Sequence, residues 1–294
     1  MKKIVLWLVV FACSFAIFDG LTGVFTDLLL AKSQFRYAKL YTKSEVSADV
    51  VVWGNSRAVD GFDVGRLSRD TGLHWVNMGY NGISPRIVEA LALDYVERHK
   101  KPDIMVFEVS NILITRGLGQ IRNLRVFERH SERLRKLDAQ NDGVMAWLAS
   151  RSALFAGNGE MFFRMIYYIG GSDQSWGFDG NISPVHAEEL INAASKMVSI
   201  EALDCDIQAY RRLFSALTQR GVKCCAVCTP VLLNQEGYEH LRKAIASIVG
   251  KNVYYIDSAH VLQEYKWFSD TVHINNAGRA VYSELLEKDL SPIL

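Results

Sequence analysis

The sequence has almost no excess of charge of either sign. Its 294 residues carry 33 Lys and Arg against 32 Asp and Glu, a formal net charge of +1. It also contains no block of like charges, no low-complexity tract and no internal repeat. The charge balance therefore gives no reason to expect a nucleic-acid partner. The hydrophobic content of 49% is enough for one large domain or two small ones with an ample core.

A second cysteine cluster is also lacking. Cys224, Cys225 and Cys228 lie in one apolar run that reads as a buried strand, where Cys behaves as a small hydrophobe. A tetrahedral metal site would require ligands from another cluster. We therefore expect core cysteines and neither a metal nor a diffusible cofactor, with a disulfide through Cys205 as the minor alternative.

The N-terminus has the pattern of a membrane-inserting segment. Two lysines precede the apolar run Ile4 to Phe18, and after a polar break the chain is again largely apolar to Ala31. No small-residue cleavage site is evident before Lys32, which favours a retained anchor at residues 1–31 over a cleaved signal peptide. A lipoprotein modified at Cys13 is the runner-up. Because positive residues stay inside, we expect the N-terminus inside and the chain after Lys32 outside the cell membrane, on its periplasmic or extracellular side.

After a juxtamembrane linker at residues 32–48, residues 49–294 predict one α/β domain. Short β-branched or apolar runs alternate with helical patterns, which indicates a five-stranded, mostly parallel sheet between two layers of helices, a three-layer α/β/α (flavodoxin-like) fold. A stretch from 112 to 203 is too long for a simple crossover and reads as a helical insertion. The expected strands are Asp49–Trp53, His74–Met78, Ile104–Val109, Val222–Cys228 and Val253–Ile256, and the helices Ala58–Arg69, Pro85–His99, Asp206–Arg220 and Tyr238–Val249.

Within the insertion, helices are expected at Asn123–Leu137 and Gly143–Tyr168. The insertion is a candidate lid, glycan groove or docking surface. The first helix would carry a basic stripe for anionic lipid or polymer, although interspersed acidic residues favour an ordinary solvated face. The stripe consists of Arg122, Arg125, Arg129, Arg133, Arg135 and Lys136.

Near the C-terminus, Asp270 and His273 lie three residues apart in a loop before the last helix. Such a pair can act as general base and orienting carboxylate for a serine nucleophile. Ser56 is the candidate nucleophile, because it follows the first core strand in the run Val-Val-Val-Trp-Gly-Asn-Ser-Arg. Alone, the Gly-Asn-Ser turn and the Asp-x-x-His pair each suit a structural role. Their common position at strand ends, where ligands bind in such sheets, favours one catalytic site.

Two further residues follow the next two strands. Gly79 comes after the second strand and Asn111 after the third. With the backbone N–H of Ser56, the Gly79 N–H and the Asn111 amide are candidate oxyanion donors. Asn111 has the alternative of closing a turn, and Arg57 is either a surface cation or the partner of an acid near the site.

These residues, in this order, resemble the blocks of the SGNH (GDSL-like) hydrolase superfamily. Gly54-Asn55-Ser56-Arg57 resembles the first block, with Asn55 in place of the usual Asp. Gly79 and Asn111 match the second and third, although the third block's usual flanking Gly and Asp are Val109 and Ile112 here. Asp270-Thr-Val-His273 matches the last. The resemblance runs from about Val50 to the C-terminus and leaves the insertion unaligned.

With the N-terminal anchor, the chain resembles the extracytoplasmic acyltransferase branch of that superfamily, which includes proteins of alginate and cellulose O-acetylation and teichoic acid D-alanyl transfer. The resemblance implies transfer of an acyl group, acetyl first, from an acyl-serine at Ser56 to a cell-envelope or secreted polysaccharide. It implies a multispanning membrane-bound O-acyltransferase as partner and polysaccharide as acceptor. Two alternatives stay open. One is a polysaccharide O-acetyl esterase with the same triad, and the other is a catalytically silent scaffold for polysaccharide assembly.

Overall fold

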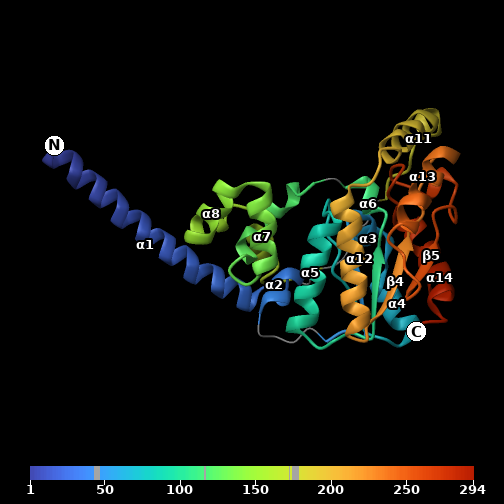
Figure 1. Cartoon of the computed structure of the whole chain (residues 1–294), viewed down its shortest axis with the longest axis horizontal. Coiled ribbons are helices and arrows are strands. Elements are labelled where there is room, and N and C mark those ends of the chain that lie inside the picture. The colour runs from blue at the N-terminus through green and yellow to red at the C-terminus, as the bar shows by residue number, and fades with distance from the viewer. Residues whose placement is uncertain (43–46, 116, 172, 174–178) are drawn as a thin grey trace. The chain divides into compact units, whose positions relative to one another are not determined.

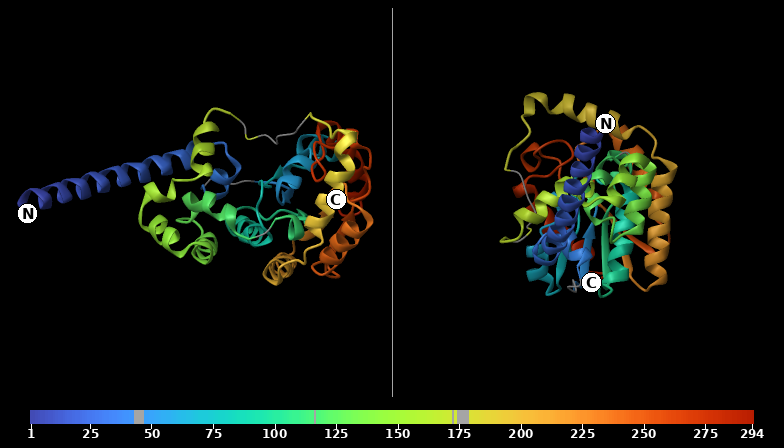
Figure 2. Two further views of the ribbon diagram at one scale, coloured as in Figure 1. Left: turned by 90° about the horizontal axis from the view of Figure 1, so that it is seen from above. Right: turned by 90° about the vertical axis from the view of Figure 1, so that its left-hand side faces the viewer.

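A computed structural model describes residues 1–294 except 43–46, 116, 172 and 174–178. The chain forms two compact units, shown in Figures 1 and 2. Unit 1 comprises Met1–Glu45 and Leu118–Asp173, and unit 2 comprises Val46–Gly117 and Gln174–Leu294. The candidate site residues all belong to unit 2.

Unit 2 is built on a five-stranded sheet in the order β2-β1-β3-β4-β5. Every neighbouring pair is parallel, so all five carboxyl ends lie at one edge, as the predicted fold requires. The expected strands are all present, with bounds that differ by one residue or less at each end. They are β1 (Val50–Trp53), β2 (Trp75–Asn77), β3 (Ile104–Glu108), β4 (Lys223–Cys228) and β5 (Val253–Asp257).

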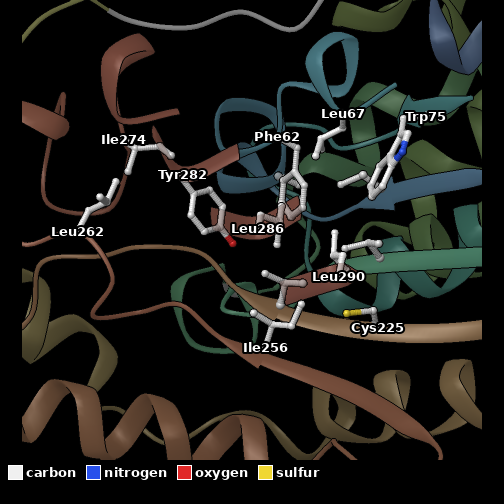
Figure 3. Packing of buried hydrophobic residues seen from close by; sticks show 14 of the residues in the cluster. Phe62, Leu67, Trp75, Cys225, Ile256, Leu262, Ile274, Tyr282, Leu286 and Leu290 are labelled. Atoms are coloured by element: carbon white, nitrogen blue, oxygen red, sulfur yellow. The ribbon is translucent and has the colours of Figure 1, made fainter. Parts of the chain in front are cut away.

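Helices cover both faces of this sheet, which makes unit 2 a three-layer α/β/α structure. Side chains of a strand alternate between faces, so Val50 and Val52 join the core cluster drawn in Figure 3 with Phe62 and Tyr282. On the other face, Trp53 packs edge-on against Tyr95, with ring centres 6.1 Å apart. The first face is covered by α3 (Ser56–Gly61), α4 (Val64–Thr71) and α14 (Asn276–Leu290), and the second by α5 (Pro85–Arg98) and α12 (Asp204–Gln219).

The expected helix Ala58–Arg69 is wrong as one element, because α3 and α4 are separate. Phe62 is extended, and Asp63 starts the second helix by accepting a hydrogen bond from Arg66 N at 2.9 Å. The short α3 leaves Phe62 free to enter the core. The remaining elements of unit 2 are α6 (Asn111–Ile114), α11 (Pro184–Val198), α13 (Gln235–Ala246) and the 3-10 turn η2 (Tyr265–Trp267).

Unit 1 combines the N-terminal helix with most of the predicted insertion. Phe35 stacks on Tyr168 with ring centres 5.8 Å apart, and Tyr41 stacks on Phe127 at 5.1 Å. The linker expected at residues 32–48 therefore contains a packed helix, α2. Elements of unit 1 are α1 (Lys2–Lys32), α2 (Arg36–Tyr41), the 3-10 helix η1 (Gly119–Phe127), α7 (Glu132–Asn141), α8 (Gly143–Arg151), α9 (Ala153–Ala156) and α10 (Glu160–Tyr167).

Three expectations for the insertion are wrong. The helix predicted at Gly143–Tyr168 is divided into α8, α9 and α10. The helix predicted at Asn123–Leu137 is divided, because Ser131 starts α7 by accepting a hydrogen bond from Leu134 N at 3.1 Å. The basic stripe is not continuous either. Arg125 is buried and forms a two-bonded ion pair with Asp138, at 2.6 and 3.0 Å. A buried guanidinium satisfied by a buried carboxylate contributes to the core of unit 1 and offers no charge to a partner.

The cysteines of β4 are core residues, as the sequence predicts. Cys224, Cys225 and Cys228 are buried and free, and burial raises the pKa of the Cys224 thiol to about 12. Cys205 is free and exposed, so the alternative of a disulfide is wrong. Cys13 lies exposed on α1.

Helix α1 has the length and apolar composition needed to cross a membrane. It spans 31 residues with a mean hydropathy of 2.3 over its most apolar window, and that window has no buried residue. Figure 2 shows its N-terminal part projecting from the rest of unit 1. Within the part of the chain that the structure describes, α1 is thus the one helix that fits a single-pass anchor.

Candidate active site

The predicted Ser, His and Asp come together at the carboxyl edge of the sheet. The Nε2 atom of His273 lies 2.7 Å from Ser56 Oγ, and its Nδ1 atom lies 2.8 Å from Asp270 Oδ2. An ionised carboxylate only accepts hydrogen bonds. With Asp270 ionised and His273 neutral, the ring proton is therefore on Nδ1 and Nε2 is free to accept the serine proton.

Ser56 owes its position to the turn between β1 and α3. It is the first residue of α3, and the side chain of Asn55 caps that helix by accepting a hydrogen bond from Arg57 N at 3.0 Å. Gly54 has a φ of 148°, and a Cβ there would lie 2.9 Å from the Cβ atoms of Ala58 and Glu108. Only glycine allows this close approach of the turn to β3.

Hydrogen bonds within the loop before α14 fix the positions of His273 and Asp270. The Oδ1 atom of Asp270 accepts hydrogen bonds from the backbone N–H groups of Val272 and His273, both at 2.8 Å. Ser269 N closes the loop on His273 O at 3.0 Å. Asn275 caps α14 directly after it by accepting a hydrogen bond from Gly278 N at 2.9 Å. One carboxylate thus fixes both the backbone of the loop and the imidazole ring.

The charge of Asp270 is favoured by these contacts. Partial burial alone would raise its pKa, but the hydrogen bond and charge of His273 and the two backbone donors together hold the pKa below its ordinary value. Its side chain is 53% exposed and that of His273 is 21% exposed. Solvent therefore reaches the base from the carboxylate side.

Gly79 packs closely against α3, and its backbone N–H already donates to another group of the protein. A Cβ at Gly79 would lie 3.0 Å from Ala58 Cβ, so a side chain would push this loop away from the helix that carries Ser56. The Gly79 N–H donates to Asn77 Oδ1 at 2.9 Å, and Asn77 Nδ2 donates to Ala58 O at 2.8 Å. Asn77 thus ties the loop to α3.

Asn111 begins α6 directly behind the third strand and is fully buried. Its Nδ2 atom donates to Ile83 O at 3.3 Å, and its Oδ1 atom accepts the Tyr210 hydroxyl at 2.6 Å. The roles of Gly79 and Asn111 as oxyanion donors stay predictions, because both groups donate to protein oxygens in the ligand-free chain. Either group would have to exchange its partner to bind a substrate oxygen.

Beneath Ser56 lies a buried ion pair. Arg57 is not the surface cation that the sequence also allowed, since its side chain is 1% exposed and its Nε lies 3.3 Å from Glu108 Oε1. Thr229, after β4, receives a 3.1 Å hydrogen bond from the same Nε atom. Glu108 Oε2 accepts from Ser110 Oγ at 2.9 Å. The pair thus connects the ends of β3 and β4 to α3, next to Ser56.

A second carboxylate lies near the triad and was not anticipated. Asp60, one helical turn after Ser56, is buried, and burial raises its pKa to about 6 against the opposing charges of His273 and Arg279. The charge of Asp270 raises it further. Its spacing from Ser56 on α3 was the only available sequence signal. Asn77 and Tyr210 were also missed, because neither follows a motif that the chain alone distinguishes.

Among the described residues, no group of three His, Cys, Asp or Glu side chains is placed to hold a metal ion. Comparison with protein-family models and with curated proteins gave no match. Among solved structures, the chain is similar to one described as "a putative platelet activating factor from Streptococcus pneumonia". The two share 11% identity over 92% of this chain and 95% of the other, with a TM-score of 0.45.

Proposed function

We propose that the chain is a membrane-anchored serine acyltransferase of the SGNH superfamily. It would move an acyl group, acetyl first, onto a hydroxyl of a cell-envelope or secreted polysaccharide. The observation that carries this proposal is the continuous Ser56, His273 and Asp270 relay, with its 2.7 and 2.8 Å contacts. The motif order and the membrane-length helix α1 support the acyltransferase branch over a free esterase.

In the first half of the reaction, Ser56 becomes acylated. His273 Nε2 takes the hydroxyl proton as Ser56 Oγ attacks the acyl carbonyl carbon, and Asp270 stabilises the resulting imidazolium. The Ser56 N–H would meet the developing oxyanion, joined by Gly79 and Asn111 once they release Asn77 and Ile83. Collapse of the intermediate breaks the bond to the donor, and His273 returns its proton to the leaving group.

In the second half, a sugar hydroxyl takes the place of the leaving group. His273 removes its proton, the sugar oxygen attacks the acyl carbon, and collapse restores the proton to Ser56 Oγ. The products are an acylated sugar and free enzyme, and no step requires a metal or diffusible cofactor. In this proposal the donor is supplied by a multispanning membrane-bound O-acyltransferase, and unit 2 lies on the extracytoplasmic side of the cell membrane.

An esterase is the second candidate, and one observation favours it. Because the Asp270 side chain is 53% exposed, water has a route to the base and can attack the same acyl-serine.

The proposal is tested by measuring how the acyl group divides between a sugar acceptor and water. The full-length protein in detergent would receive p-nitrophenyl acetate as donor and increasing concentrations of envelope-type oligosaccharides. Mass spectrometry would then measure acetylated sugar and free acetate. A transferase gives acetylated sugar that rises with acceptor concentration and disappears in Ser56→Ala. Free acetate alone, at every acceptor concentration, would contradict transfer and support the esterase.

A further inference from the structure

Unit 1 exposes a set of large apolar side chains on its short helices. Val144 and Trp147 of α8 are 71% and 57% exposed, and Leu154 of α9 is 38% exposed. Phe163 and Tyr167 of α10 are 65% and 70% exposed. We call these five residues the interfacial surface. Aromatic and aliphatic groups are seldom left together in water without a partner.

The free part of α1 is too short to cross a bilayer alone. The apolar run Ile4 to Phe18 is exposed along its whole length, and at 1.5 Å per residue it spans about 22 Å. The hydrocarbon core is about 30 Å thick and requires about 20 residues of helix. The span must therefore continue past Asp19, along the part of α1 that packs on unit 1.

Asp19 is where the packing begins. Its Oδ1 atom accepts hydrogen bonds from Ser152 Oγ at 2.5 Å and from Leu154 N at 2.9 Å. These donors satisfy a carboxyl that would be costly near lipid if it had no partner. Leu154, a member of the interfacial surface, thus lies at the level of α1 where the free run ends.

The same level has a hollow between α1 and α9. It measures about 340 Å³ and is open to the outside, with a lining of Phe15, Leu154, Phe155, Gly157 and Asn158. Phe15 belongs to the free apolar run of α1, so apolar surface continues from the membrane-crossing helix onto α9. Three of its five lining residues, Phe15, Leu154 and Phe155, are large and apolar, as expected of a surface beside acyl chains.

Helix α10 adds apolar contacts with α1 beyond Asp19. Phe25 contacts Phe162 with ring centres 6.1 Å apart, and Phe162 contacts Phe163 at 5.7 Å. On α1, one stripe is buried by unit 1 while Phe25 and Leu28 remain 46% and 52% exposed. At 1.5 Å per residue, a 30 Å core that begins at Ile4 ends near Phe25.

The composition of α8 is that of a membrane interface. The Arg151 guanidinium lies 5.6 Å from the centre of the Trp147 ring. Tryptophan and arginine gather at headgroup level, where an apolar ring meets lipid and a cation meets phosphate. Val144, Trp147 and Arg151 recur at helical spacing on the exposed side of α8, opposite the buried Ala146 and Ala149.

We propose that the interfacial surface sits in the outer part of the leaflet from which α1 emerges, from the acyl chains beside Asp19 to the headgroups beside Trp147 and Arg151, with lipid as its partner. Two members of the surface adjoin α1, Leu154 at the hollow beside Phe15 and Phe163 through Phe162, and they extend the apolar surface past the free run of α1. Unit 1 then packs against one side of α1 at the outer end of the span and contacts lipid through the interfacial surface. This inference does not depend on the chemistry at Ser56.

Depth-dependent fluorescence quenching tests the proposal with the full-length protein in vesicles of phosphatidylcholine and phosphatidylglycerol. Trp7→Phe removes the tryptophan of the free run. The fluorescence of this variant minus that of Trp7→Phe/Trp147→Phe then gives the signal of Trp147. A matched control, Trp7→Phe/Trp147→Phe/Lys136→Trp, moves the probe to a 70% exposed charged position on α7 of the same unit. Both positions are exposed, so all variants should fold.

We expect lipid brominated near the headgroup end of its acyl chains to abolish most of the Trp147 signal. Lipid brominated near the chain end should have less effect, and the Lys136→Trp signal should persist in both. An unquenched Trp147 would overturn the proposal and leave the surface free for a protein partner. Equal quenching of the two positions would also overturn it, because it would indicate contact without a defined depth.

Discussion

The Nε2 atom of His273 lies 2.7 Å from the Oγ atom of Ser56, although the two residues are 217 positions apart in the chain. Parallel strands cause this proximity, since β1 delivers Ser56 to the same sheet edge at which the loop before α14 presents His273. The same loop also carries the carboxylate, because Asp270 lies three residues before His273. The three candidate catalytic residues thus come from only two segments.

Replacement of the orienting carboxylate should reduce turnover with little change in fold. In Asp270→Asn, the amide oxygen can still accept the backbone N–H groups of Val272 and His273, but the Nδ1 tautomer is no longer enforced. We expect the rate of p-nitrophenyl acetate turnover to fall about 10³- to 10⁴-fold, by analogy with serine proteases. Asp257→Asn, which alters a surface pair with Arg242, is the control and should retain activity. A loss of less than tenfold for Asp270→Asn would argue against the relay.

The buried Arg57–Glu108 pair should dominate the stability of the edge beneath Ser56. Arg57→Met leaves a buried carboxylate without its cation, at an expected cost of about 3–5 kcal/mol in the free energy of unfolding. The double variant Arg57→Met/Glu108→Met should lose less than the sum of the single changes. Urea unfolding measures each value. The control Arg220→Met, at an exposed pair with Glu97, should cost at most about 1 kcal/mol. If the losses of Arg57→Met and Glu108→Met simply add in the double variant, the two side chains are not coupled.

The pKa of Asp60 predicts a pH window for stability. A carboxyl whose pKa is raised from 3.8 to about 6 favours the folded state when protonated. Its contribution to the free energy of unfolding is fully present below pH 3.8 and is lost as the pH rises through about 6. The free energy of unfolding falls by about 3 kcal/mol over this range. Asp60→Asn stays neutral, so the stability of the variant relative to wild type should rise across this window. Urea midpoints from pH 4 to pH 7 measure it, and a constant difference would contradict the raised pKa.

Glycine is required at position 79 for space and not for backbone conformation. In Gly79→Ala, the new Cβ would lie 3.0 Å from both Ala58 Cβ and Asn77 Oδ1, so the loop should shift from α3. We expect a loss of about 1–3 kcal/mol in stability together with reduced kcat. The matched control is Gly65→Ala on the exposed side of α4, where the nearest atom is 3.5 Å away. That change should stabilise by up to about 1 kcal/mol, and an unaffected Gly79→Ala would show that the loop has room.

Tyr210 should act by orienting Asn111. Tyr210→Phe removes the hydroxyl that donates to Asn111 Oδ1 at 2.6 Å and leaves that oxygen without this donor. The expected cost is about 1–3 kcal/mol. If Asn111 serves the oxyanion, kcat should fall while KM changes little, whereas a purely structural role would lower stability alone. Steady-state kinetics beside thermal unfolding separates the two outcomes.

Much of unit 2 could be predicted because its signals are local. The strands are short apolar runs flanked by turns. Ser56 starts the helix after the first strand, and Asp270 and His273 lie in the loop before the last helix, so their positions follow from the order of the elements. The break between α3 and α4 was missed, since the helical pattern continues through Phe62 and only the cap at Asp63 interrupts it. Asn77 and Tyr210 could not be assigned, because their roles depend on contacts between segments that no spacing reveals.

Unit 1 was harder to predict for a related reason. A basic residue in a helical pattern looks solvated, yet Arg125 is buried because Asp138, on the next helix, offers a complete partner. Likewise, the packing of α2 through Tyr41 and Phe127 joins a segment near the anchor to the insertion. Such pairings depend on tertiary structure that the sequence pattern does not encode.

Covalent labelling with a serine-directed probe tests directly whether Ser56 is the nucleophile. The folded full-length protein would be treated with a fluorophosphonate and its mass measured intact, followed by peptide mapping. We expect one adduct, on Ser56, that is absent in Ser56→Ala and retained in Ser269→Ala, a neighbour of His273 that is not in the relay. No adduct on folded wild type, or equal labelling of Ser56→Ala, would contradict the account and favour a silent scaffold.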